Sequence, residues 1–242
     1  MKTRDEWHRL RGTNMGKVNF DDFAEDYDEI LIRQLHVFES GADYFAQYKV
    51  SLVKNRLTRK PARILDFGCG VGNNIRHLIN AFPSATITGC DVSIKCLEVA
   101  NTKNPSAEFF NIAYNADSFA GRFDLVFIAN VFHHIPPGQR FETLHLVRQF
   151  MSENGELFIF EHNPYNPVTR HIVQTCPFDA DAELIKPKHL IALLNKADFS
   201  IVTRQYILFF PNFLSKLRPI EEYLTSVPLG GQYVIQASKK LL

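Results

Sequence analysis

One stretch decides how this chain folds: Arg63-Ile64-Leu65-Asp66-Phe67-Gly68-Cys69-Gly70-Val71-Gly72-Asn73-Asn74. A short apolar run is interrupted by an acid, and three glycines follow at alternate positions before a segment of helical character. Buried parallel strands have such apolar sequences. Glycines directly after a strand let the backbone turn tightly and approach a ligand more closely than any Cβ would allow. The stretch therefore predicts a strand, a ligand-binding turn and a helix.

The glycine spacing distinguishes between two kinds of nucleotide-binding turn. The dinucleotide-binding fingerprint is GxGxxG, with an acid about 20 residues later. Here the spacing is GxGxG, and Asp66 already stands two residues before Gly68. This pattern resembles motif I of the class I S-adenosylmethionine (SAM)-dependent methyltransferases. The resemblance implies that Asp66, Gly68 and Gly70 hold the methionine end of SAM.

Strands and helices alternate along the rest of the chain, which predicts a wound α/β sheet. The further strands are expected at 85–91, 108–111, 123–130, 155–161, 200–209 and 232–239. The resemblance implies a Rossmann-like sheet of seven strands in the order 3-2-1-4-5-7-6, with strand 7 antiparallel. Helices are expected before the first strand at 20–35 and 39–57, and later at 93–104 and 188–196. The region 163–186 is expected to be irregular. The region 211–231 is expected to form a lid insertion with a short helix around 213–217. A flexible leader, 1–19, is expected to precede a single domain, 20–242.

The remaining cofactor contacts follow from the strand ends. Asp91 ends the second predicted strand, where a carboxylate accepts hydrogen bonds from ribose hydroxyls; the alternative is that it only caps the next helix. The resemblance also implies that Val92 packs beside the adenine, that Asn130 lies near the sulfonium and that Tyr27 closes over SAM.

The contact to the adenine amino group stays open at this stage. In the family it commonly comes from an acid after the third strand. This sequence has Asn111 there and Asp117 further on. The contact could come from Asn111, from Asp117 or from a backbone group.

His133 and His134 follow the fourth predicted strand. Adjacent residues point to different faces, so the pair is poorly placed to chelate one ion and no metal site is expected. Either a histidine is hydrogen-bonded beneath the sheet end, or one lines the acceptor pocket as a general base, with His134 preferred. His162, which follows the fifth strand, is a third catalytic candidate.

A second functional region is expected just past the fifth strand, at the edge where wound α/β sheets bind ligands. Polar residues cluster there on a turn stiffened by Pro164 and Pro167. Asn163, Tyr165 and Arg170 are therefore candidate acceptor-binding residues. The alternative is a rigid loop whose polar groups face water.

Bulk composition narrows the class of protein. The 242 residues include 27 Lys and Arg against 26 acids, without a basic run, which argues against a nucleic-acid partner. No apolar run approaches the roughly 20 residues that span a bilayer, so no stable membrane insertion is expected. The four cysteines show no CxxC pair, which fits a reducing, cytoplasmic location.

The function predicted from these residues is SAM-dependent methyl transfer to a small-molecule acceptor, with S-adenosyl-L-homocysteine as the other product. The phenylalanine-rich segment 209–214 indicates an apolar, amphipathic or lipid-linked acceptor. Two alternatives are an NAD(P)-dependent oxidoreductase and a module that binds SAM without catalysis. The sequence does not predict the oligomeric state.

Overall fold

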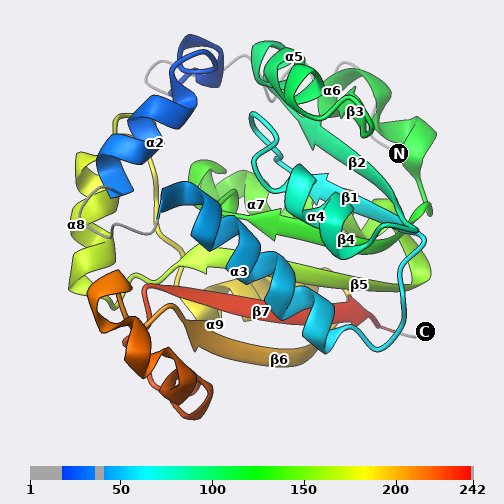
Figure 1. Ribbon diagram of the computed structural model, residues 1–242. Helices are drawn as coiled ribbons and strands as arrows, with labels where there is room; N and C mark the ends of the chain where they lie inside the picture. Colours follow the sequence, from blue (N-terminus) through cyan, green and yellow to red (C-terminus); the bar gives the residue numbers. More distant parts are fainter. Residues whose placement is uncertain (1–17, 36–40, 241–242) are drawn as a thin grey trace.

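The computed structural model describes residues 18–35 and 41–240, arranged around one seven-stranded sheet (Figure 1). The strand order is β3-β2-β1-β4-β5-β7-β6, and β7 pairs antiparallel with both β5 and β6. The other neighbouring pairs are parallel. The predicted order and the antiparallel seventh strand are confirmed. The strands are β1 (Arg63–Phe67), β2 (Thr86–Asp91), β3 (Glu108–Asn111), β4 (Phe123–Ala129), β5 (Met151–His162), β6 (Phe199–Ile207) and β7 (Gln232–Lys239).

Helices surround this sheet on both faces and at its carboxyl edge. The α-helices are α2 (Tyr27–Leu35), α3 (Gly41–Arg56), α4 (Ile75–Ala81), α5 (Ile94–Lys103), α6 (Ile112–Asn115), α7 (Pro137–Phe150), α8 (Pro167–Thr175) and α9 (Pro187–Lys196). The 3-10 helices are η1 (Phe20–Asp22), η3 (Ala116–Phe119), η4 (Phe132–His134), η5 (Pro177–Asp179) and η6 (Asn212–Tyr223). Among the described helices, none combines the length and the apolar character that crossing a bilayer requires.

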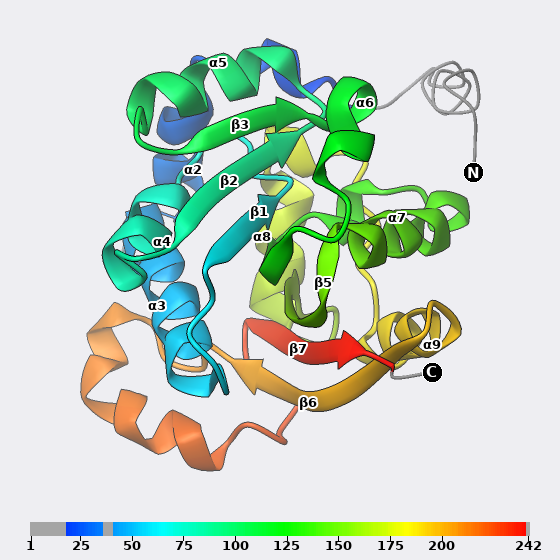
Figure 2. The same cartoon turned by 90° about the vertical axis from the view of Figure 1, so that its right-hand side faces the viewer.

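Two apolar layers hold the sheet between its helices, because successive strand residues face opposite sides. In β4, Leu125 and Phe127 join the layer that contains residues of α3 and α4. Val126 and Ile128 join the opposite layer, which contains residues of α7 and α9. Figure 2 shows these two helix groups on opposite sides of the sheet. A strand buried on both faces has the continuous apolar sequence seen here.

Three segments differ from the sequence predictions. The expected helix at 20–35 is divided into η1 and α2; Asn19 starts the short η1 turn by accepting from the backbone N–H of Asp21. The segment 163–186 is not irregular throughout but contains α8 and η5. The lid insertion forms η6 rather than a short α-helix. Residues 1–17 of the expected leader 1–19 and the expected start of the second helix at 39–40 lie outside the described residues.

The prediction for 163–186 was wrong because prolines were counted only as helix breakers. Asn166 caps α8 by accepting a hydrogen bond from the backbone N–H of Thr169, and Pro167 occupies the first turn. Proline is favoured there, since its missing N–H would have no intrahelical partner. Asn-Pro is therefore a helix start in this context.

The glycine turn after β1 brings the backbone close to α5. Gly72 has a φ of +81°, and a Cβ there would lie 2.7 Å from Asn104 Nδ2 and 3.0 Å from the Cβ of Ala100. Asn104 in turn donates a hydrogen bond to the carbonyl oxygen of Gly72 (3.2 Å). Gly70, with a φ of +52°, would meet no atom within 4 Å. Gly72 thus seats the turn against α5, whereas Gly70 borders open space.

This difference predicts unequal costs for two matched substitutions. Gly72→Ala combines an unfavourable left-handed backbone, costing about 1–2 kcal/mol, with overpacking that costs about 1–3 kcal/mol. We expect it to lower the free energy of unfolding by roughly 3 kcal/mol in urea denaturation. Gly70→Ala carries the backbone cost alone, about 1–2 kcal/mol. Equal losses would show that α5 shifts freely and that packing against Gly72 contributes nothing.

Candidate active site

A cavity of about 1040 Å³ opens at the carboxyl ends of the parallel strands. Segments far apart in the sequence line it: the glycine turn, the residues after β4 and β5, α8, η5 and the start of η6. Figure 1 shows α2 and α8 gathered beyond this edge of the sheet. Ligand pockets commonly measure about 300–1,000 Å³, so this cavity lies at the upper end of that range.

Asp66 lies directly beneath the glycine turn. It is fully buried, and neither carboxylate oxygen has a hydrogen-bond partner among the described residues. Burial raises the pKa of this carboxyl to about 7. Gly68 and Gly70 line the cavity itself, whereas Asp66 stands behind them. A buried acid without a donor is costly, which indicates a place prepared for a cationic or donor group of a ligand.

Asp91 is fixed at the end of β2 by two backbone amides. Its Oδ2 accepts from the N–H of Gly70 and its Oδ1 from the N–H of Ser93, each at 2.9 Å. Burial raises the pKa of Asp91. The helix cap of α5 is Ser93, whose hydroxyl accepts from the N–H of Cys96. Asp91 therefore connects the glycine turn to the start of α5, and its oxygens keep lone pairs for a ligand on the cavity side.

The other residues predicted to contact the cofactor near Asp91 differ in whether they line the cavity. Val92 lines the cavity and is 63% exposed, so its apolar side chain is accessible to a ligand in the cavity. Asn111 does not line it: its Nδ2 donates to the carbonyl oxygen of Val92, and its Oδ1 caps α6. Asp117 is exposed on η3 and also lies outside the lining. The cavity wall here is the segment 112–114, whereas Asn111 and Asp117 both lie outside the lining.

Tyr27 and Asn130 both line the cavity. The Tyr27 ring stacks on Phe178 with a centroid distance of 4.9 Å and an interplanar angle of 6°. Burial raises the pKa of its hydroxyl, which therefore stays protonated. Asn130 has a φ of +59°, and its Oδ1 is buried without a partner among the described residues. Left-handed asparagines after a strand often mark functional turns.

The histidines after β4 are positioned by one buried carboxylate. Glu161, at the end of β5, accepts from the backbone N–H of Val131 (3.0 Å) and of Phe132 (2.7 Å). Its Oε2 lies 2.6 Å from Nδ1 of His133. Arg140 holds the same turn by donating to the carbonyl oxygens of Phe132 and Ile135. Strand ends far apart in sequence are thereby tied into one rigid wall.

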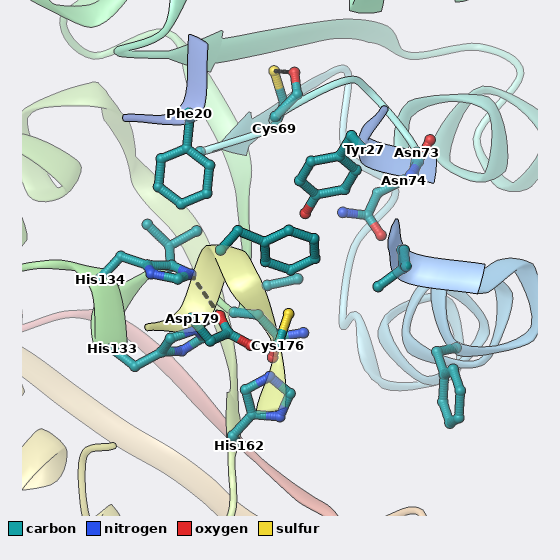
Figure 3. A pocket seen from close by; sticks show the side chains of 18 of the residues that line it. Phe20, Tyr27, Cys69, Asn73, Asn74, His133, His134, His162, Cys176 and Asp179 are labelled. Atoms are coloured by element: carbon teal, nitrogen blue, oxygen red, sulfur yellow. Dashed lines mark hydrogen bonds and ion pairs between the residues drawn. The ribbon is translucent and has the colours of Figure 1, made fainter. Parts of the chain in front are cut away.

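Asp179 completes a polar cluster with the histidines (Figure 3). Its Oδ1 lies 3.5 Å from Nε2 of His133 and 3.3 Å from Nε2 of His134. The expectation that adjacent histidines diverge was wrong, because the 3-10 turn places their ring centroids 4.1 Å apart. The ring of His162 lies 5.0 Å from that of His133. One potential ligand atom each from His133, His134 and Asp179 lies within 4.8 Å of the others.

The charges of this cluster are strongly coupled. Burial alone would lower the pKa of His133, but the carboxylates of Glu161 and Asp179 outweigh it and raise the pKa to about 9. Burial lowers the pKa of His134, and the neighbouring His133 lowers it further. Burial, with the charge of His133, lowers the pKa of His162 to about 3. His134 and His162 are therefore neutral near pH 7 and can accept a proton.

The three acceptor candidates after β5 lie outside the cavity lining. Asn163 is fully buried and donates from Nδ2 to the carbonyl oxygens of Pro228 (3.1 Å) and Gly230 (2.7 Å). It ties the loop after β5 to the segment before β7. Tyr165 and Arg170 are exposed and do not line the cavity. From this region, it is α8 that contributes, through residues such as Thr169 and Ile172.

Sequence reasoning missed Asp179, Cys176 and Phe178, which come from the segment around η5. No local pattern marks them, because only the path of the chain after α8 brings them beside the histidines. The lid phenylalanines were found: Phe209, Phe210 and Phe213 line the cavity. Phe213 is 77% exposed. An apolar wall thus faces the polar cluster.

Comparison with known proteins places this geometry among methyltransferases. Residues 64–155 match the profile of a methyltransferase domain. The chain is 31% identical over 148 residues to a demethylmenaquinone methyltransferase of Thermotoga maritima, covering 61% of each chain. It is 37% identical over 78 residues to a trans-aconitate 2-methyltransferase of Rhodopseudomonas palustris, covering 31% of this chain and 30% of that protein. The matches thus span less than two thirds of these relatives' lengths.

A solved structure supports the same fold over a longer range. The crystal structure of a SAM-dependent methyltransferase from Archaeoglobus fulgidus superposes with a TM-score of 0.64 at 20% identity. The superposition covers 84% of this chain and 99% of that one. At this identity the likeness concerns the fold, and it covers more of the chain than the matched domain profile does.

The burial of Asp66 predicts a pH-dependent stability. Its carboxyl titrates near pH 3.8 when unfolded but near pH 7 in the fold, so the folded chain holds the extra proton between these values. The unfolding free energy contributed by Asp66 therefore falls as pH rises through that window. Asp66→Asn removes the titration. We expect the variant to gain on the order of 3 kcal/mol over the parent at pH 8 and almost nothing at pH 4.

Urea denaturation of both proteins across this pH range measures the difference. Asp117→Asn, the same change at an exposed position, serves as the control and should follow the parent at every pH. A constant difference between Asp66→Asn and the parent would show that Asp66 stays ionised in the fold at pH 5–7.

Proposed function

We propose that this chain is a class I SAM-dependent methyltransferase that transfers the methyl group of SAM to a small-molecule acceptor. The proposal rests on one observation: the same cavity is lined by a different kind of residue at each of its two ends. At one end lie the glycine turn with Gly70 and the carboxylate of Asp91; at the other lie His134 and His162. A bisubstrate reaction needs both partners in one enclosed space.

The cofactor end fits SAM on its own observations. Open space borders Gly70, where a bulky ligand can approach the backbone. Asp66 offers two buried oxygens without a donor behind the turn, which suits the cationic methionine end. We infer that Asp91 binds the ribose hydroxyls, that Val92 packs against the adenine and that backbone groups of 112–114 contact its edge. Tyr27 and Asn130 then flank the reacting centre.

The chemistry then divides between cofactor and protein. SAM supplies a methyl group already activated on a sulfonium. The residues of this chain have to orient the acceptor, exclude water and take up a proton where the acceptor carries one. His134 and His162 line the cavity as neutral imidazoles, which fits proton acceptance. His133, held between two carboxylates, serves to position rather than to accept a proton.

The acceptor that best matches the cavity is a small amphipathic molecule. Aromatic rings of Phe209, Phe210 and Phe213 provide an apolar wall, and the histidine cluster provides a polar end. Such a molecule would place its apolar part under η6 and its nucleophilic atom near the histidines. The names of the relatives include a demethylmenaquinone methyltransferase and a trans-aconitate 2-methyltransferase, both of which are named for small-molecule acceptors. We further propose a cytoplasmic location, since all four cysteines are free and buried.

Calorimetric titration with SAM, S-adenosylhomocysteine and NADH tests the cofactor, and turnover tests the chemistry. Micromolar binding of both adenosyl compounds without NADH binding is the expected result. Binding of NADH alone would refute the assignment in favour of an oxidoreductase. With SAM bound, release of S-adenosylhomocysteine in a screen of quinols, hydroxy acids and amino sugars identifies the acceptor. Binding without turnover on any acceptor would support a non-catalytic SAM-binding module.

Asp91→Asn tests the ribose contact directly. Losing charge-assisted hydrogen bonds to the ribose should weaken SAM binding by about 10- to 100-fold, equivalent to roughly 1.5–3 kcal/mol. Asparagine keeps one acceptor oxygen for the backbone amide of Gly70 or Ser93, so the fold should persist; a thermal melt checks this. Glu98→Gln, the same change on the exposed side of α5, is the matched control and should bind SAM like the parent. Unchanged affinity in Asp91→Asn would leave Asp91 as a purely structural link.

A further inference from the structure

The polar end of the cavity has the composition and spacing of a metal centre. We propose that His133, His134 and Asp179 bind one divalent first-row transition-metal ion at the acceptor end of the cavity. All three residues line the cavity, and one ligand atom of each lies within 4.8 Å of the other two. Figure 3 shows the carboxylate of Asp179 beside the rings of His133 and His134, with a dashed line to His134.

The two distances from Asp179 to the histidines are those of shared coordination. Ligand atoms bound at about 2.0–2.1 Å around a tetrahedral ion lie roughly 3.3 Å from one another. Oδ1 of Asp179 lies 3.3 Å from Nε2 of His134 and 3.5 Å from Nε2 of His133. Nε2 of His133 is buried and, despite this approach, makes no hydrogen bond to any described residue. A nitrogen in this state, 99% shielded from water, lacks the partner that buried polar atoms require.

The surroundings favour the tautomer that coordination needs. Nδ1 of His133 lies 2.6 Å from the carboxylate of Glu161, so a proton stays on Nδ1 when an ion displaces the one on Nε2. A ligating histidine ordinarily donates its second ring N–H to a carboxylate in this way. The same carboxylate accepts from the backbone amides of Val131 and Phe132, and Arg140 donates to the carbonyl oxygen of Phe132. His133 and the turn that carries it are therefore held in place by contacts that an ion would not disturb.

The alternative to a metal ion is an ion-pair cluster held together by protons. Glu161 and Asp179 are two buried carboxylates on either side of one imidazole, that of His133. In this alternative a protonated His133 contacts both acids, and His134 donates from Nε2 to Asp179 Oδ1 at 3.3 Å. A metal ion would replace these protons and bind all three side chains at once. Lys49, the buried cation nearby, divides its charge between Glu161 and Asp66.

The donor set indicates which ions would bind. Two imidazoles and one carboxylate suit Zn²⁺, Co²⁺ or Fe²⁺, whereas Mg²⁺ and Ca²⁺ prefer all-oxygen sites. Three protein ligands leave at least one position open, and the side chains that supply them line the cavity. If the proposed methyl transfer is correct, a metal there would polarise an oxygen or nitrogen of the acceptor and ease its deprotonation.

Metal binding is measured without SAM or acceptor, so the outcome is independent of the proposed methyl transfer. Protein stripped with a chelator is titrated with Zn²⁺ and, separately, with Co²⁺, whose visible absorption reports coordination geometry; Mg²⁺ is the negative ion. We expect one Zn²⁺ per chain, an intense Co²⁺ spectrum of low-coordinate type that Zn²⁺ displaces, and no response to Mg²⁺. His134→Ala and Asp179→Asn should each weaken Zn²⁺ binding by more than about 100-fold, since even outer-shell changes cost 10- to 100-fold.

His189→Ala, which removes an exposed histidine on α9, is the matched control and should bind Zn²⁺ like the parent. Thermal melts of the apo proteins establish that each variant is folded. The parent's Co²⁺ spectrum needs no variant and decides the matter even where Asp179→Asn fails to fold. Substoichiometric Zn²⁺, a weak six-coordinate Co²⁺ spectrum, or equal losses in His134→Ala and His189→Ala would overturn the site in favour of the proton-sharing ion pair.

Discussion

The site depends on the buried carboxylate of Glu161. Removing this charge from water costs several kcal/mol, and only the hydrogen bonds that it accepts offset that cost. Those bonds come from two backbone amides after β4 and from the ring of His133. Because Glu161 ends β5, it fixes the chain leaving β4 relative to the neighbouring strand. The turn that carries the histidines has no other carboxylate within hydrogen-bond distance of its backbone amides among the described contacts. Its position is therefore set by an interaction across the sheet, not by its own sequence.

The wound sheet gives this interaction its functional meaning. Parallel strands end at one edge, so residues that follow β1, β2, β4 and β5 meet there although they are up to a hundred residues apart. The chain order reverses between β1 and β4, which separates the glycine turn and Asp91 on one side from Glu161 and the histidines on the other. The cavity extends across this border. A fold of this kind places a nucleotide-type ligand and a second reactant side by side without any residue being shared between them.

The parts that sequence reasoning predicted are those governed by local rules. The alternating glycines, Asp66 and Asp91 could be recognised because strand, turn and acid follow one another within a few residues. The sheet order came from family resemblance rather than from spacing. Asp179 could not be found, because it joins the cluster through the path of α8 and η5, which no local pattern encodes. Asn163 was misjudged for a similar reason: its amide is consumed by carbonyl oxygens more than sixty residues away. A polar residue at a sheet edge indicates a binding role only when its side chain is not needed to hydrogen-bond nearby backbone groups.

Burial explains why so many polar groups can be concentrated at one edge. The two apolar layers shield the strands on both faces, and the low dielectric that results strengthens each polar contact while making each missing one more costly. In this protein the missing contacts are not scattered: Asp66, Asn130 and His133 each carry a buried atom without a partner among the described residues, and all three flank the same cavity or its floor. An ordinary core would have eliminated them, since each lowers stability. Their concentration around one enclosed space follows if ligands supply the absent partners. The unpaired atoms therefore lower the stability of the fold at the site where ligand binding would restore it. The apolar layers on both faces of the sheet stabilise the fold enough to tolerate this cost.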